Sequence, residues 1–129
     1  MVYSKYQKIS KSKAEIKKIT INYCKNKKRN WFVADAECYN AHSRRYKDLF
    51  GFGDLIVIDD IELPGVLFIQ ITTETHAENH IADVLYDVKK RVYAKELLIK
   101  ENRIWFFFFK KDKNSKWTYR IQKLTLKDF

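Results

Sequence analysis

Three polar side chains stand at the ends of two short apolar segments, and their types suit the binding of a metal ion. Asp54 comes just before residues 55–58, and Gln70 and Thr72 close residues 66–72. An acid and an amide contribute less to a core than more valine or isoleucine would. Together with water and phosphate oxygens, carboxylate and amide oxygens are the ligands that Mg²⁺ prefers.

The two apolar segments predict a β-hairpin that brings these side chains together. The first segment is continuously apolar and β-branched, which predicts a strand buried on both faces. Residues 59–65 contain the Asp, Pro and Gly typical of turns, and the second segment predicts the partner strand. Because the start of one antiparallel strand lies beside the end of the other, we expect Asp54 near Gln70 and Thr72. The last two share one face because they are two residues apart.

Each of these residues also has a purely structural interpretation. Asp54 follows Gly53, where aspartate is common in turns. Gln70 lies between two isoleucines, and it either faces solvent on an edge strand or is buried. A buried amide without partners costs about 1–3 kcal/mol. Both interpretations of each residue remain open.

Two segments have helical periodicity and flank the hairpin. The first begins with the capping-box spacing of Ser12 and Glu15, so Glu15 is either a cap or a site residue. The second begins with the same spacing at Thr75 and Glu78, and it predicts one long helix to about Lys100. Its apolar positions recur at i, i+4, i+7 and i+11: Ile81, Leu85, Val88 and Val92.

The remaining pattern predicts a single α/β (α+β) domain over residues 1–129. Further strands are expected at 31–34, 103–110 and 117–122, and a polar loop at 39–47. The order α-β-β-β-α-β-β predicts a mixed sheet of about five strands flanked by two main helices. Four consecutive phenylalanines, 106–109, point to both faces of this sheet, so both faces must be covered. Because the domain has few helices, a second subunit is expected to cover one of them. A homodimer is therefore expected.

The composition favours a polyanionic partner. The chain has 26 Lys and Arg against 16 Asp and Glu, which gives a net charge of +10. Nucleic acid is the simplest partner for such a surplus, although a genome that enriches every surface in lysine gives the same composition. The two cysteines form no CxxC, which excludes a zinc site or disulfide framework and favours the cytoplasm. The basic N-terminus is no signal peptide, and the longest apolar run, six residues, is too short to span a membrane.

Basic and imidazole side chains near the hairpin are candidates for contact with phosphate. Arg44, Arg45 and Lys47 alternate with aromatic residues just before Asp54, a pattern suited to phosphates and bases, with a solvated loop as the alternative. His76 and His80 are i, i+4 neighbours. They either touch phosphate or a metal, or form a solvated pair.

This layout resembles the PD-(D/E)XK (restriction-endonuclease-like) nuclease superfamily, which includes archaeal Holliday junction resolvases. In that family a helix bearing an acid precedes a hairpin that carries Asp and then (D/E)-x-K, followed by a helix and more strands. The segments DLFGFGDLIVID, FIQITT and HAENHIADVL are similar to those of small phage-encoded nuclease or resolvase-like members. The resemblance runs from Ser12 to about Trp117.

The resemblance implies a set of site residues. Asp54 takes the place of the metal-binding Asp, Gln70 that of the second acid, and Thr72 that of the Lys. Glu15 takes the place of the helical acid that completes the metal shell, and the carbonyl of Ile71 is implied as a further ligand. The implied ion is Mg²⁺ or Mn²⁺.

Two positions depart from the family pattern. A neutral Gln70 binds a divalent cation more weakly than a carboxylate, and Thr72 lacks the positive charge of the family's Lys. The missing cation has candidates on the second helix: Lys89, Lys90 and Arg91, with His76 and His80 near its start.

The resemblance implies a metal-dependent DNA endonuclease, with branched DNA such as a Holliday junction among its expected substrates. Such an enzyme would act in the cytoplasm, or in the host cytoplasm if phage-encoded. Two alternatives follow from the departures: a weakened or inactive nuclease-fold protein that binds nucleic acid, or a small phage-type interaction protein.

Overall fold

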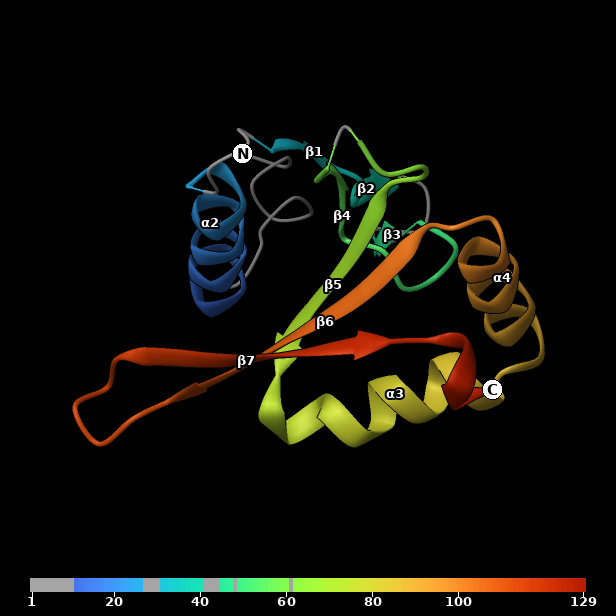
Figure 1. The fold of residues 1–129 in the computed structure, drawn as a ribbon. Coiled ribbons are helices and arrows are strands. Elements are labelled where there is room, and N and C mark those ends of the chain that lie inside the picture. The colour runs from blue at the N-terminus through green and yellow to red at the C-terminus, as the bar shows by residue number, and fades with distance from the viewer. Residues whose placement is uncertain (1–10, 27–30, 41–44, 48, 61) are drawn as a thin grey trace.

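A mixed five-stranded sheet forms the centre of the molecule (Figure 1). The computed structural model describes residues 11–26, 31–40, 45–47, 49–60 and 62–129. The strands in spatial order are β1 (Phe32–Asp35), β4 (Leu55–Ile58), β5 (Leu67–Thr73), β6 (Arg103–Lys111) and β7 (Trp117–Leu124). Only β5 and β6 run parallel, and the other neighbours are antiparallel. The predicted α+β class and mixed sheet are confirmed.

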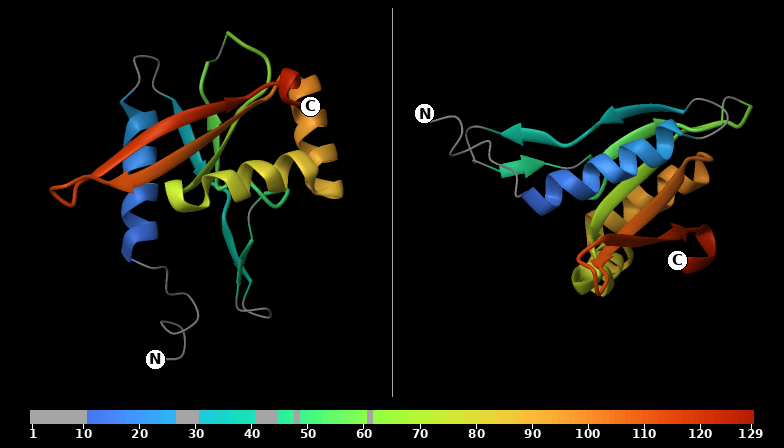
Figure 2. Two further views of the ribbon diagram at one scale, coloured as in Figure 1. Left: turned by 90° about the horizontal axis from the view of Figure 1, so that it is seen from below. Right: turned by 90° about the vertical axis from the view of Figure 1, so that its left-hand side faces the viewer.

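Helices cover both faces of the sheet (Figure 2). The helices of the described residues are α2 (Lys11–Lys25), α3 (Ala77–Tyr86) and α4 (Val88–Ile99), with short 3₁₀ turns η1 (Glu74–His76) and η2 (Leu126–Asp128). Residues of α2 pack into the core on one face, whereas α3 and α4 supply the core on the other. The predicted order of elements holds roughly, with one helix more than the two expected and two additional short strands between residues 38 and 47.

The four phenylalanines of β6 divide between the two cores. Phe106 and Phe108 pack against α3 and α4, and Phe107 and Phe109 pack on the side of α2. All four are fully buried within one chain. Because the chain's own helices cover both faces, these strands give no reason to invoke a second subunit.

The prediction of one long helix after the hairpin is wrong, because the helix is interrupted at Asp87. This residue has extended backbone angles, and its carboxylate accepts hydrogen bonds from the backbone N–H groups of Lys89 and Lys90, so it caps a new helix, α4. Val88 and Val92 are 81% and 55% exposed instead of lying on the core face. A strong N-cap inside an apolar repeat therefore overrode the periodicity.

Three local predictions also differ from the structure. The predicted capping box at Thr75 and Glu78 is absent, because α3 begins after His76 without a side-chain cap. The segment predicted as a polar loop contains two short strands, β2 (Cys38–Asn40) and β3 (Arg45–Lys47), which pair antiparallel. In β4 only alternate residues are buried, since its neighbour β1 is an exposed edge strand. No helix in the described ranges has the length and apolarity needed to cross a bilayer.

Candidate active site

Asp54 and Gln70 lie at the same end of the β4–β5 hairpin and line one pocket. Leu55 pairs with Ile69, and the backbone N–H of Asp54 donates to the carbonyl of Ile69 at 2.8 Å. Ile69 thus lies opposite both Leu55 and Asp54, as at a β-bulge, and the side chains of Asp54 and Gln70 line the same pocket. Both residues are only 4% exposed. The turn between the strands thus fixes an acid beside an amide.

A cavity of about 400 Å³ lies over this pair. Its walls come from the start of α2, the segment after β1, the hairpin, η1 and α3. The lining residues are Ser12, Lys13, Ile16, Glu37, Asp54, Gln70, Ile71, Thr72, Thr73, His76 and His80. Six of the predicted site residues thus share one pocket: Asp54, Gln70, Ile71, Thr72, His76 and His80.

The Asp54 carboxylate is held by the backbone of the partner strand. Its Oδ2 accepts a hydrogen bond from the N–H of Ile71 at 2.7 Å. An amide N–H stabilises the ionised form of a buried carboxylate. Ile71 thus contacts the site through its backbone N–H. The role as a metal ligand that the resemblance implies for its carbonyl stays a prediction.

The amide oxygen of Gln70 has no partner among the described residues. Its Nε2 lies 2.8 Å from His80 Nδ1, and because an amide nitrogen only donates, this ring nitrogen is the acceptor. The Oε1 atom is buried and accepts no hydrogen bond from the described residues. The other ring nitrogen of His80 lies 3.5 Å from the hydroxyl of Thr72. The contact with His80 therefore leaves the oxygen, not the nitrogen, as the end of the Gln70 amide without a partner among the described residues.

Lys13 and Glu37 add opposite charges at the pocket wall. The ammonium of Lys13 lies 2.6 Å from Glu37, and Lys17 lies 2.9 Å from the same carboxylate. Burial acts to raise the pKa of Glu37, but hydrogen bonds and charge from the two lysines outweigh it and hold this pKa below its ordinary value. Burial likewise acts to lower the pKa of Lys17, and its contacts with Glu37 and Asp35 raise it overall. The acid is thus already neutralised by two ammonium groups.

Neither Lys13 nor Glu37 was among the site residues that the sequence predicted. Glu37 follows the edge strand β1, which pairs with β4. The N–H of Ala36 donates to the carbonyl of Asp54 at 2.9 Å, so the end of β1 reaches the pocket. The order of strands in the sheet was the missing information, because an acid after an edge strand carries no signal by itself.

Other predicted site residues lie elsewhere. The carboxylate of Glu15 accepts a hydrogen bond at 2.8 Å from the indole N–H of Trp117, and Glu15 is not part of the pocket wall. Lys89 and Lys90 are on α4, where Lys90 pairs with Asp83, and neither lines the pocket. Arg44 lies outside the described residues, as do the side chains of Arg45 and Lys47.

The groups present in the pocket fit a hard divalent cation held by few protein ligands. In the parts of the chain that the structure describes, no group of three or more His, Cys, Asp or Glu is close enough to bind a metal. Asp54 and the unpartnered Gln70 Oε1 nevertheless provide one carboxylate and one carbonyl oxygen. Mg²⁺ commonly uses one or two carboxylates and takes its other ligands from water and substrate phosphate.

Comparison of the chain with protein-family models, with curated proteins and with solved structures yields no match.

Proposed function

We propose that the chain is a metal-dependent nuclease that hydrolyses phosphodiester bonds in DNA. The observation that carries the proposal is the buried Gln70 Oε1, which has no partner among the described residues and belongs to the same pocket lining as Asp54. Leaving a buried acceptor without a partner costs about 1–3 kcal/mol, and a cation shared with Asp54 would offset that cost. The +10 net charge and the resemblance to PD-(D/E)XK nucleases support DNA as the substrate.

Asp54 and Gln70 are the residues that would hold Mg²⁺ or Mn²⁺. Bound there, the ion would polarise the scissile phosphate and lower the pKa of a water molecule. The N–H of Ile71 keeps the Asp54 carboxylate oriented. His80 keeps the carbonyl end of the Gln70 amide, rather than its nitrogen, directed away from the imidazole.

Lys13 is the side chain best placed to supply the cation that Thr72 lacks. It lines the same pocket from the first turn of α2, and its ammonium is held by Glu37. A lysine contacts phosphate as a point charge, so it can stabilise negative charge on the phosphate during hydrolysis. Glu37 is then a positioning residue for Lys13. The candidates on α4 are not needed for this role.

Metal-dependent cleavage is the direct test. The purified chain is incubated with linear, flapped and four-way DNA in Mg²⁺, in Mn²⁺ and in EDTA. We expect cleavage with either metal and none in EDTA. Asp54→Asn should abolish it, whereas Asp83→Asn, which changes an acid of α3 outside this pocket, should not. Absence of cleavage of every substrate in both metals would contradict the proposal.

A second pair of variants tests the role of Lys13. Lys13→Met should lower the rate of cleavage at saturating DNA by at least about a hundredfold, the scale of losing one electrostatic contact to the transition state. Lys13→Arg keeps the charge and should restore part of that rate. Equal loss in both variants would instead indicate that Lys13 matters only for the packing of α2.

DNA binding without cleavage is the second candidate function. It is favoured by one observation, the uncharged Thr72 beside the pocket at the position of the family's lysine. Salt-dependent binding of DNA by a chain that cleaves none of the three substrates would support it.

A further inference from the structure

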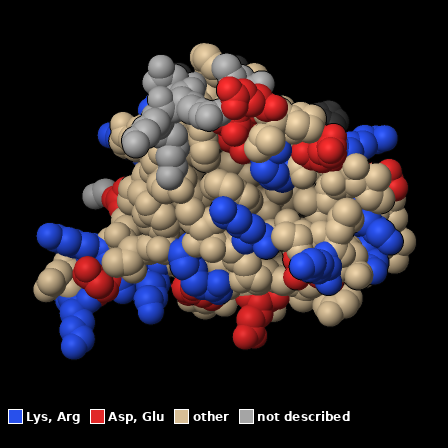
Figure 3. Space-filling model, viewed as in Figure 1, with Lys and Arg blue, Asp and Glu red and all other residues tan. Residues whose placement is uncertain are grey.

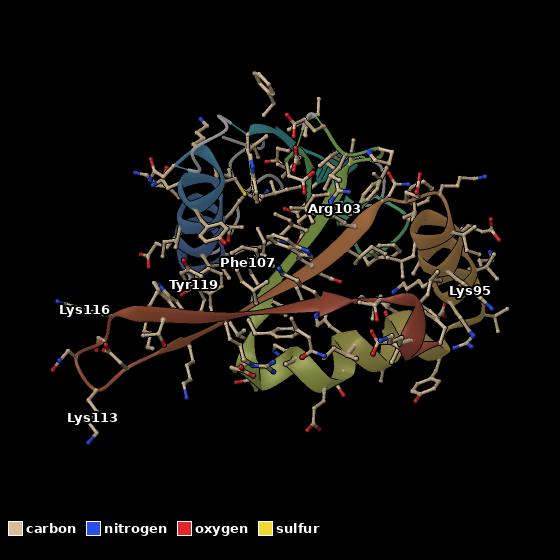
Figure 4. All side chains as sticks on the ribbon, viewed as in Figure 1. Lys95, Arg103, Phe107, Lys113, Lys116 and Tyr119 are labelled. Carbon is tan, nitrogen blue, oxygen red and sulfur yellow. The ribbon has the colours of Figure 1, made fainter. Side chains whose placement is uncertain are left out.

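The hairpin of β6 and β7 extends beyond the rest of the sheet and forms an arm (Figure 1). Its last paired residues are Lys110 with Thr118 and Lys111 with Trp117, and residues 112–116 close the turn. Figure 4 shows Lys113 and Lys116 at the tip, far from Lys95 on α4. We use "the arm" for residues 110–117.

The turn of the arm has a defined structure. The carboxylate of Asp112 accepts hydrogen bonds from the N–H groups of Asn114 and Lys116, at 2.8 and 3.0 Å. The backbones of Asp112 and Lys116 also bond to each other, and Ser115 takes a left-handed conformation with φ of 59°. The arm therefore presents its side chains from an ordered backbone, which lowers the entropy lost on binding.

The arm is strongly basic, and its one acidic side chain, Asp112, already accepts hydrogen bonds within the turn. It carries four exposed lysines: Lys110, Lys111, Lys113 and Lys116. Asp112 is held by the turn. Figure 3 shows the corresponding cluster of basic atoms where the hairpin projects at the lower left. Such a concentration of charge at the end of a thin projection is complementary to the phosphates of nucleic acid.

Two contacts brace the base of the arm, one on each face of the hairpin. On one face the indole of Trp117 donates to Glu15 of α2. On the other face the guanidinium of Arg120 pairs with Glu74 of η1 and lies 4.7 Å from the ring centre of Phe108. Glu15, which the resemblance assigned to the metal, thus orients the arm instead.

The same braces fix the arm relative to the candidate active site. Lys13 in α2 lines the pocket two residues before Glu15, and Thr73 in β5 lines it next to Glu74. Thr73 also pairs with Phe109, the residue before the arm begins. The pocket and the arm therefore lie at the same end of the sheet.

We propose that the arm lies in a groove of duplex DNA and that its lysines contact phosphates on either side. This inference rests on the proposed function and names the surface that holds the substrate. A two-stranded β-ribbon fits the major groove. The tip, residues 112–116, has no aromatic side chain, and Trp117 at the base is engaged by Glu15 and Lys111, which favours duplex over single-stranded DNA. Lysine–phosphate contacts set position and carry no sequence information, so no base preference is expected from the arm.

Fluorescence anisotropy with a labelled duplex in EDTA tests the arm without cleavage. The double variant Lys113→Ala, Lys116→Ala is compared with Lys95→Ala, Lys100→Ala, which removes two exposed lysines from the end of α4. Each lost phosphate contact lowers the slope of log affinity against log salt by about 0.9. We expect the arm variant to lose about tenfold or more in affinity at 0.1 M salt, and the α4 variant less than about twofold.

The outcomes separate the arm from the active site. If the wild type binds the duplex and the arm variant binds within twofold of it, the inference is overturned while metal-dependent cleavage still stands. If a single strand of the same length competes as well as the duplex, the assignment of duplex DNA is overturned. A wild type that neither binds nor cleaves DNA at low salt removes both proposals. Circular dichroism checks that the variants, which leave the Asp112 contacts intact, remain folded.

Discussion

Two buried aspartates flank strand β4, and their surroundings differ. Asp54 precedes the strand and Asp59 follows it, and they are 4% and 5% exposed. The carboxylate of Asp59 accepts hydrogen bonds from Nε and Nη2 of Arg103, the first at 2.8 Å. Asp54 accepts a hydrogen bond from a backbone N–H and shares a pocket with Gln70, whose amide oxygen has no partner among the described residues.

The comparison shows that burial of an acid does not by itself indicate a function. Arg103 satisfies both oxygens of Asp59 in a bidentate pair, which is the usual structural solution for a buried carboxylate. At the other end of β4, Asp54 and Gln70 line a cavity, and Oε1 of Gln70 accepts no hydrogen bond from the described residues. Only the second arrangement leaves an acceptor that a ligand would satisfy.

The largest expected effect separates the two acids by activity. Asp54→Asn should lower DNA cleavage about a thousandfold or more, because several kcal/mol of metal-derived stabilisation are lost. The asparagine oxygen still accepts the N–H of Ile71, so urea unfolding should change by less than about 1 kcal/mol. Single-turnover cleavage and urea titration measure the two quantities, and a large loss of stability with unchanged activity would reverse the assignment.

The second effect is on stability at the other acid. Asp59→Asn leaves the partly buried Arg103 without its counter-charge and should lower the free energy of unfolding by about 2–4 kcal/mol. Cleavage by the folded fraction should stay near that of the wild type. The free energy comes from urea denaturation. Full stability in this variant would mean that the two aspartates do not differ as described.

The third prediction concerns a substitution that replaces the amide of Gln70 with a carboxylate. Gln70→Glu places a second carboxylate beside Asp54, which should destabilise the chain by about 1–3 kcal/mol in EDTA. Addition of Mn²⁺ should recover that stability, because binding to the folded state alone shifts the unfolding equilibrium. Thermal unfolding with and without Mn²⁺ measures both, with Gln122→Glu on β7 as a control. No greater metal response than in the control would argue against a cation at this place.

The smallest prediction concerns pH and the positioning acid. Because the folded pKa of Glu37 is lowered, its ionised form stabilises the fold above the ordinary carboxyl pKa, and this contribution disappears as pH falls through the lowered value. Glu37→Gln should therefore cost about 1–2 kcal/mol at pH 7 and progressively less below about pH 4.5. Urea midpoints measured across this range test it, and a difference independent of pH would contradict the sign.

The β4–β5 hairpin, with Asp54 and Gln70 at one end, could be predicted from the sequence because it depends on local rules. Turn residues between two apolar segments fix antiparallel pairing, and that pairing brings Asp54 to the same end of the hairpin as Gln70. The contact that Glu15 makes could not be predicted in the same way. Its actual partner, Trp117, is 102 residues away, and no local spacing could have distinguished this contact from a cap or a ligand.

Helix boundaries were harder to predict than strands. The apolar repeat from Ile81 to Val92 favours one helix, but Asp87 satisfies the N–H groups of a second one, and the energy of this cap exceeds the weak preference from periodicity. As a result, Val88 is exposed to solvent instead of packing in the core. Strand β6, by contrast, was predicted closely because its long aromatic run has no competing local signal.

The sequence alone determined the class of fold, the hairpin and the excess of positive charge, because hydrophobic period, turn chemistry and composition act locally or as sums. Tertiary structure decided which polar groups share a cavity, which acid is paired with Arg103, and where Glu15 and Lys13 point. These outcomes depend on the order of strands in the sheet and on the side on which α2 packs. Contacts between distant residues form only once the whole sheet exists, so no short segment encodes them.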